Sequence, residues 1–149
     1  MNAVDWSALE TPLDPEPEFF VQPPDKRKDW TELQRQTTLL RLAHMFAPRV
    51  MIFANANAGK RNPRKAKAEG IRAGVFDLTC LWRGPLPAFI EMKGYTKGGR
   101  PGALSRNQIE FGNRCVQLGI PAACFFDPYD ALNWLREQGF PVAEVRRAA

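Results

Sequence analysis

No stretch of this 149-residue chain stays apolar for the roughly 18 residues that a membrane-spanning helix needs. The N-terminal sequence MNAVDWSALE lacks the basic flank and the apolar stretch of a signal peptide. We therefore expect a protein that works inside the cell without a membrane partner. Its length suits one domain with its own core, and its 44% hydrophobic and 25% charged residues are typical of a globular protein.

Cysteine and histidine are scarce. The three cysteines, Cys80, Cys115 and Cys124, form no CxxC pair, which argues against a disulfide framework and against a structural zinc site. We expect three buried, reduced thiols. His44, the single histidine, has no nucleophile or metal ligand at motif spacing, so the sequence argues against histidine-centred catalysis.

Acidic and basic residues are unevenly distributed along the chain. Residues 1–29 carry a net charge of −4, whereas the remaining 120 residues carry +9. A basic body favours polyanionic partners, with nucleic acid first among them. Charge alone leaves a second interpretation open, in which the surplus lysines and arginines only keep the protein soluble.

The acidic segment also differs in composition. It contains five prolines and no helical or strand periodicity, so we expect residues 1–29 to form an extended, acidic, proline-rich tail before a folded domain at 30–149. The pair Phe19-Phe20 has two interpretations, docking on that domain or docking on a partner.

Hydrophobic periodicity and turn signals predict seven elements in the order α-β-β-β-α-β-α. Their expected ranges are 30–46, 49–54, 75–82, 88–93, 105–118, 120–126 and 127–139. The basic segment 55–74 is expected as a loop with one helical turn in its middle. The turn at 84–87 makes a hairpin of its two strands. Helix 105–118 joins strand 88–93 to the apolar strand 120–126 as a parallel, right-handed crossover. The predicted fold is α/β, with a mixed central β-sheet flanked by helices.

Two capping boxes are predicted at helix starts. Asp29 is the expected cap of the first helix, with Glu32 as its capping-box partner. Ser105 is the expected cap of the helix at 105–118, with Gln108 as partner. Glu32 and Gln108 thus have a structural interpretation beside the functional one given below.

The strand at 88–93 carries the triplet Glu91-Met92-Lys93. Strand side chains alternate between faces, so Glu91 and Lys93 point the same way, about 7 Å apart, and Met92 points the opposite way. Asp77 lies on the paired strand of the hairpin, opposite the end that carries Glu91 and Lys93. Two carboxylates and an ammonium group are therefore expected to converge at one end of the hairpin.

This convergence suits metal-assisted phosphate chemistry. Two carboxylates and the backbone carbonyl of Met92 match a hard cation such as Mg²⁺ or Mn²⁺. The metal would polarise a phosphodiester and lower the pKa of a bound water, while Lys93 would orient that water or stabilise the charge on the phosphate. An E-x-K triplet alone is common by chance in a chain of this length. The competing interpretation is a structural ion-pair cluster at a strand end.

Basic segments flank the cluster in sequence. Their side chains are candidates for phosphate contacts, which position DNA without reading its sequence, and the alternative is a solvated surface. The predicted DNA-binding residues are Lys60, Arg61, Arg64, Lys65, Lys67 and Arg72 before Asp77, and Lys97, Arg100, Ser105 and Arg106 after Lys93. Asn55 and Asn57 are either DNA contacts or turn residues. Trp30, Trp82 and Trp134 fit packing better than base stacking.

The stretches KAEGIRAGVFDLTCL, FIEMKGY, GALSRNQIEF and LGIPAACF resemble VRR-NUC domains, the virus-type replication-repair nucleases of the PD-(D/E)XK superfamily. The resemblance covers about residues 30–138. The shared features are a Gly-x-x-x-Gly approach at 70–74, the metal-binding acid Asp77, the E-x-K strand, and the helix start Ser105-x-x-Gln108 followed by the aromatic Phe111. The family also has an acid on its first helix, for which Glu32 is the candidate. Phe76 stands where the family has a proline, which does no chemistry there, so the departure concerns only the local backbone path.

The resemblance implies a PD-(D/E)XK restriction-endonuclease-like fold and a divalent-metal phosphodiesterase acting on DNA, with Asp77, Glu91 and Lys93 as catalytic residues and Gln108 and Glu32 beside them. Stand-alone phage and bacterial members resemble dimeric enzymes that cut branched DNA such as Holliday junctions in replication, recombination or repair. We accordingly expect a structure-selective endonuclease, homodimeric and cytoplasmic, in a bacterial cell or a phage-infected host.

Two alternatives to a junction-resolving enzyme remain. Larger relatives cut flaps, so a flap or nicking nuclease of repair or restriction is one. The other is a non-catalytic DNA-binding module on the same fold. The intact set of Asp77, Glu91 and Lys93 argues against this second alternative, because a copy without activity usually loses one of them.

Overall fold

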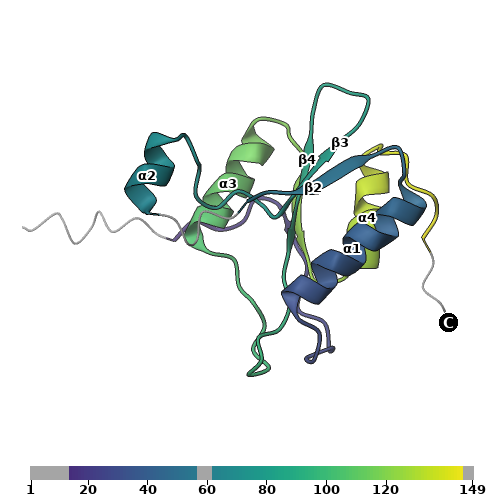
Figure 1. The fold of residues 1–149 in the computed structure, drawn as a ribbon, viewed down its shortest axis with the longest axis horizontal. Helices are drawn as coiled ribbons and strands as arrows, with labels where there is room; N and C mark the ends of the chain where they lie inside the picture. Colours follow the sequence, from purple (N-terminus) through teal and green to yellow (C-terminus); the bar gives the residue numbers. More distant parts are fainter. Residues whose placement is uncertain (1–13, 57–61, 146–149) are drawn as a thin grey trace, which may run out of the picture.

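The computed structural model describes residues 14–56 and 62–145 (Figure 1). These residues form one five-stranded mixed sheet with the strand order β1-β5-β4-β3-β2. The strands are β1 Phe20–Val21, β2 Met51–Ala54, β3 Leu78–Leu81, β4 Ala88–Met92 and β5 Ala122–Phe125. The helices are α1 Glu32–Phe46, α2 Pro63–Ala68, α3 Arg106–Gln117 and α4 Pro128–Glu137. The α/β class and the mixed sheet are those that the sequence predicts.

Two strand pairings in the centre of the sheet position the candidate site. β3 and β4 are antiparallel, with Leu78 opposite Ile90, as the predicted hairpin requires. β4 and β5 are parallel, with Glu91 beside Cys124, and α3 connects them, as predicted for a crossover. β3 begins at Leu78, so Asp77 lies just before the strand and not on it, which corrects the predicted range of 75–82.

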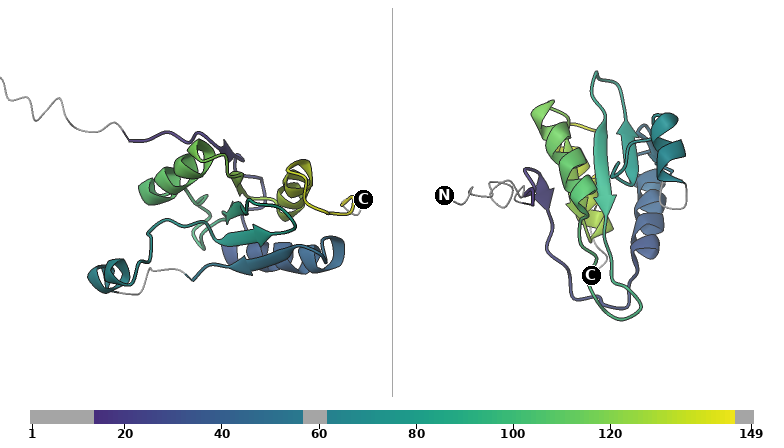
Figure 2. Two further views of the ribbon diagram at one scale, coloured as in Figure 1. Left: turned by 90° about the horizontal axis from the view of Figure 1, so that it is seen from above. Right: turned by 90° about the vertical axis from the view of Figure 1, so that its left-hand side faces the viewer.

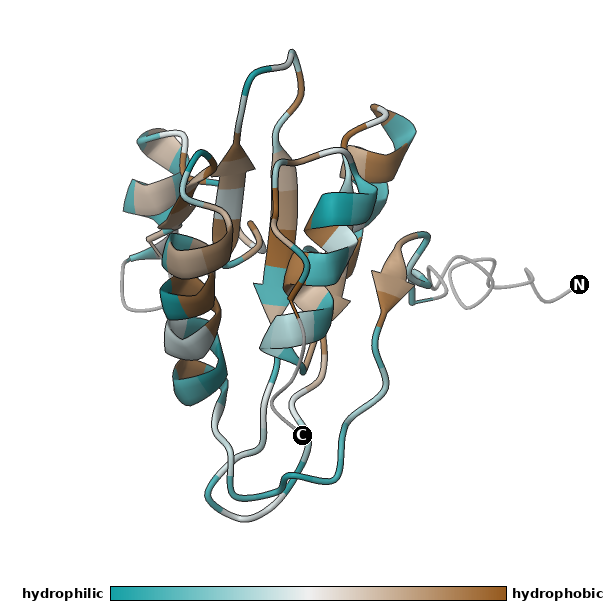
Figure 3. Cartoon of the chain, turned by 90° about the vertical axis from the view of Figure 1, so that its right-hand side faces the viewer, coloured by the Kyte–Doolittle hydropathy of each residue, from teal (hydrophilic) through white to brown (hydrophobic). Residues whose placement is uncertain are grey.

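The helices lie in layers on both sides of the sheet. α1 and α4 cover one face and α3 covers part of the other, as the two views of Figure 2 show. Alternate strand side chains divide between these layers: Ile90 and Met92 enter the core with α1 and α4, and Phe89 packs with Phe111 of α3. Apolar residues are concentrated on the sheet between the helices (Figure 3). None of the described helices is both long enough and apolar enough to cross a bilayer.

Residues 14–29 are more closely packed against the domain than a free tail would be. β1 adds a parallel strand to β5, and the buried Phe19 ring packs on Phe76 and fills the space beside Gly112. A side chain at Gly112 would put its Cβ 2.2 Å from the Phe19 ring. The Phe19-Phe20 pair therefore docks on the chain's own body. A two-residue strand is too short to show a period in the sequence, and residues 1–13 lie outside the described part of the chain.

The cap of α1 differs from the prediction. Thr31, not Asp29, is the N-cap: its hydroxyl accepts the backbone N–H of Gln34, and the Gln34 side chain accepts the backbone N–H of Thr31. Glu32 is the first helical residue and takes no part in that capping box, which leaves its carboxylate free for another role. The predicted box of Ser105 and Gln108 at the start of α3 is confirmed.

Candidate metal centre

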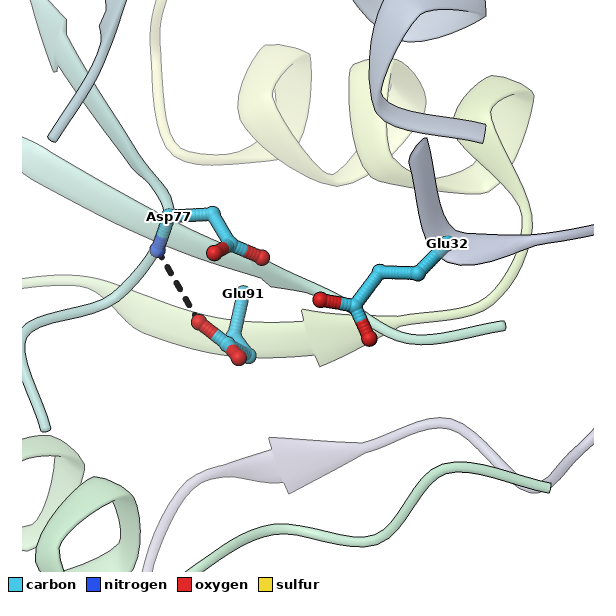
Figure 4. Close-up of side chains that lie close together, drawn as sticks. All are labelled: Glu32, Asp77 and Glu91. Carbon is cyan, nitrogen blue, oxygen red and sulfur yellow. Dashed lines mark hydrogen bonds between the residues drawn. The ribbon is translucent and has the colours of Figure 1, made fainter. Parts of the chain in front are cut away.

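Asp77 and Glu91 are joined where the β3–β4 ladder ends. Beyond the pair Leu78 and Ile90, the backbone N–H of Asp77 donates to Glu91 Oε2 at 2.9 Å (Figure 4). The backbone N–H of Met92 donates to Asp77 Oδ2 at 3.0 Å. The Glu91 carboxylate thus binds the backbone just before β3, and the Asp77 carboxylate binds the backbone of β4. This reciprocal pair of hydrogen bonds fixes both acids at the same end of the hairpin, as the sequence predicts.

Lys93 lies on the same face of β4 as Glu91. Its Nζ is 3.0 Å from Glu91 Oε1, and both side chains are buried, whereas the intervening Met92 side chain enters the core on the opposite face. A buried carboxylate and a buried ammonium group thus touch. The alternation of a single strand is enough to produce this arrangement, so the prediction from the E-x-K triplet is confirmed in its geometry.

Gln108 completes a helix cap and also contacts the glutamate and the lysine of the cluster. Its Oε1 accepts the backbone N–H of Ser105 at 2.9 Å, which completes the cap of α3, and also accepts Lys93 Nζ at 3.2 Å. Its Nε2 donates to Glu91 Oε1. One amide therefore links the N-terminus of α3 to Glu91 of β4 and to Lys93, which directly follows that strand.

Glu32 brings a third carboxylate to the pair from the first turn of α1. Oxygen atoms of Glu32, Asp77 and Glu91 all lie within 4.8 Å of one another, and Figure 4 shows the three side chains grouped together. Gly94 allows this approach, because a Cβ there would lie 2.3 Å from the Glu32 backbone nitrogen. The loop after β4 can therefore pack directly on the start of α1.

Burial dominates the electrostatics of the cluster. It raises the pKa of Glu91 to about 7, with the Asp77 charge acting in the same direction and Lys93 opposing it. Burial also raises the pKa of Asp77 and of Glu32. For Lys93, burial acts to lower the pKa, but the attraction of Glu91 and Glu32 outweighs it, so the pKa is raised and the ammonium stays charged.

The donor set suits a divalent cation. With all groups ionised, three carboxylates face one ammonium, and the surplus negative charge in a half-buried site is the kind that a cation offsets. Two oxygens on one Mg²⁺ at about 2.1 Å can be at most about 4.2 Å apart, so small side-chain rotations bring the three carboxylates within range. The N–H of Met92 points to the Asp77 side, and its carbonyl, on the same edge of the strand, points there too.

The predicted DNA-binding residues fall on two separate parts of the fold. α2, at one side of the molecule in Figure 1, carries Arg64, Lys65 and Lys67, all exposed, and the exposed Arg72 follows it. The loop between β4 and α3 carries Lys97 and Arg100, which are both exposed.

At the start of α3 the predicted phosphate contacts already have partners. Arg106 is exposed and binds Glu110 at 3.0 Å and Asp14 at 3.9 Å. The Ser105 hydroxyl accepts the Gln108 backbone N–H, as a helix cap does. Lys60, Arg61 and Asn57 lie outside the described residues.

The tryptophans, cysteines and histidine considered in the sequence analysis lie at the surface or pack against other side chains. Trp30 stacks under Arg27 and Arg35, and Trp134 packs on Phe125, as expected for packing roles. The three cysteines are free and buried. His44 is exposed in the last turn of α1.

Phe76, the residue before Asp77, is fully buried between Phe19 and Phe111. Packing of its ring therefore fixes the backbone path into Asp77.

The contacts of two residues were not predicted from the sequence: those of Arg35, and those of Asn55, which was predicted only as a DNA contact or a turn residue. Arg35, on α1, is fully buried and binds Asp25 through two nitrogens, at 2.6 and 2.9 Å, and the carbonyl of Phe126 at 2.9 Å. It thereby fastens the segment before α1 and fixes the start of that helix. Asn55 binds the backbone beside Asp77. Neither side chain belongs to a sequence motif that would have revealed its partners, which lie 5 to 91 residues away.

The candidate centre thus unites residues from four places in the chain: Glu32 of α1, Asp77 before β3, Glu91 and Lys93 at the end of β4, and Gln108 of α3. No protein-family model, no curated protein and no solved structure matches this chain at a significant level.

Proposed function

We propose that this protein is a divalent-metal-dependent DNA endonuclease with a PD-(D/E)XK-type centre. The observation that carries the proposal is the convergence of Asp77, Glu91 and Lys93 on one face at one end of the β3–β4 hairpin. A structural ion pair needs one acid for one base, whereas this cluster has three acids around a single lysine. Such an excess of carboxylate oxygens favours a metal site over a salt bridge.

The residues divide the work of phosphodiester hydrolysis. Asp77, Glu91 and the Met92 carbonyl would hold Mg²⁺ or Mn²⁺, with Glu32 as a further oxygen ligand. When bound, the metal supplies Lewis acidity toward a phosphate oxygen and lowers the pKa of a bound water. Lys93 presents a buried positive charge where negative charge accumulates on the phosphate. Gln108 holds Lys93 and Glu91 in a fixed relation.

DNA is the proposed substrate because the chain body is basic and because exposed cations lie on α2 and on the loop after β4. We propose branched DNA, such as a four-way junction, as the preferred form, and a homodimer as the active species. Two symmetric cuts on a junction require two centres related by a two-fold axis, which a homodimer provides.

The test is Mg²⁺-dependent cleavage of a four-way junction, a flap and a linear duplex by the full chain, beside Asp77→Ala and Lys93→Met. The wild type should cut and both variants should lose at least about 100-fold in kcat, the loss typical of one transition-state charge stabiliser. Symmetric cuts confined to the junction, with a dimer in sedimentation, would support a resolving role, and cuts on the flap alone would point to a flap nuclease. Binding without cleavage by the wild type would leave only a DNA-binding module.

A further inference from the structure

Asn55 makes three hydrogen bonds around the peptide that leads into Asp77. Its backbone N–H donates to the Asp77 carbonyl at 2.7 Å, and its side-chain Nδ2 donates to the Phe76 carbonyl at 2.8 Å. Its Oδ1 accepts the Thr79 hydroxyl at 3.0 Å. Asn55 follows the last residue of β2 directly, so this residue connects an edge strand of the sheet to the site.

The orientation of the Asn55 amide is fully determined. A carbonyl oxygen only accepts hydrogen bonds, so the NH₂ group must face Phe76 and the amide oxygen must face Thr79. Thr79 is buried on β3, two residues beyond Asp77, and its hydroxyl keeps the amide turned this way. Asn55 is half-buried, and both polar atoms of its side chain have hydrogen-bond partners.

Asp77 depends on this support because it lies outside the regular ladder. β3 begins one residue later, and the backbone N–H of Asp77 donates to the Glu91 side chain and not to a backbone carbonyl of β4. The Phe76 ring holds the preceding residue by packing, and Asn55 holds its carbonyl. Rotation of the peptide between residues 76 and 77 would move the N–H away from Glu91 and the carboxylate away from Met92.

We propose that Asn55 is a positioning residue for the metal ligand Asp77, with Thr79 acting through Asn55. The proposal rests on the function proposed above for this site. Asn55 touches the backbone on either side of the aspartate and does not bind the metal itself. Partners that orient a metal ligand in this way typically contribute about 10–100-fold to metal affinity or activity.

The decisive variant is Asn55→Ala, with Asn113→Ala as a matched control. Asn113, on α3, also binds main chain with both side-chain atoms, the Glu18 N–H at 2.7 Å and the Glu16 carbonyl at 2.9 Å, but not at the site. We expect Asn55→Ala to weaken Mn²⁺ binding to the metal-free protein about 10-fold or more, and to lower kcat about 10–100-fold with the KM for DNA within about twofold. Asn113→Ala should change neither quantity.

A double-mutant cycle with Thr79 tests the chain of contacts. Thr79→Val removes the hydroxyl with little change of shape and should lower kcat about threefold to tenfold, the effect of one neutral hydrogen bond, whereas Thr79→Ser should retain wild-type activity. In the Asn55→Ala background, Thr79→Val should have no further effect, because its partner is already gone. Equal additional losses in both backgrounds would overturn the link between the two residues.

The outcomes separate this proposal from the proposed function. A wild type that binds Mn²⁺ but cuts none of the three DNA substrates refutes the nuclease, and the Mn²⁺ titration of Asn55→Ala still decides the role of Asn55. Unchanged Mn²⁺ affinity and kcat in Asn55→Ala, or the same losses in Asn113→Ala, would overturn the positioning role. A rise in KM alone would mean that Asn55 contacts DNA, and a wild type without Mn²⁺ binding would refute both proposals.

Discussion

Metal binding at the carboxylate cluster should release a proton near neutral pH. Burial beside Asp77 raises the pKa of Glu91 to about 7, so a cation must compete with a proton for the glutamate oxygens. For one group with this pKa, the ionised fraction is about one tenth at pH 6, one half at pH 7 and nine tenths at pH 8. The apparent Kd for Mn²⁺ should therefore fall, that is, binding should tighten, about tenfold from pH 6 to pH 8.

Calorimetric titration with Mn²⁺ in two buffers of different ionisation enthalpy measures both the Kd and the protons released. About half a proton per metal is expected at pH 7, more at pH 6 and little at pH 8. Lys93→Met provides a signed control: the lysine charge lowers the pKa of Glu91, so its removal should move the whole transition to higher pH. A wild-type Kd that stays constant from pH 6 to pH 8, without proton release, would refute this reasoning.

Three further perturbations test separate parts of the site. Gln108→Leu should lower both the melting temperature and kcat, because the Gln108 amide belongs to the helix cap and to the candidate centre. Ser105→Ala removes only the cap, so it should lower the unfolding free energy by about 1 kcal/mol and leave kcat unchanged; equal losses of kcat in the two variants would contradict this distinction. Gly94→Ala places a Cβ 2.3 Å from the backbone of α1, so it should lower the unfolding free energy measured in urea titrations by more than about 2 kcal/mol. Gly98→Ala should leave the unfolding free energy nearly unchanged, because its Cβ would meet no atom nearer than 3.8 Å. Lys65→Glu on α2 should weaken DNA binding and reduce the slope of log Kd against log salt by about one or more; an unchanged slope would remove α2 from the DNA interface.

Local signals account for most of the predicted elements. Ser105 with Gln108 and Asp127 with its following proline mark helix starts that the structure reproduces. The glycine-proline turn makes the β3–β4 hairpin, and the wholly buried β5 is the apolar run that predicted a strand covered on both faces. Each of these signals acts within a few residues, so the chain carries it in readable form.

The differences between the predicted and the observed structure come mainly from contacts between residues far apart in the sequence. β1 is only two residues long and exists through its pairing with β5, about a hundred residues away in the chain. The buried Arg35 depends on Asp25 and on the Phe126 carbonyl, which no periodicity links to it. At the start of α1, Asp29 and Thr31 could each have capped the helix, and the structure has Thr31, whose capping-box partner is Gln34.

Some features of the candidate site were predictable from local sequence, and others depend on long-range packing. Strand alternation and the hairpin determine, from sequence alone, that Glu91 and Lys93 share a face and that Asp77 meets them, because these relations follow from the pleat of two adjacent strands. Glu32 was a candidate from the sequence with a capping role as the alternative, and the tertiary structure decided that its carboxylate joins the other two. The support that Asn55 gives to Asp77 was visible only in the tertiary structure. Those side chains arrive from separate elements, and their approach depends on how α1 and the edge strand pack on the sheet, which short spacings in a sequence do not record.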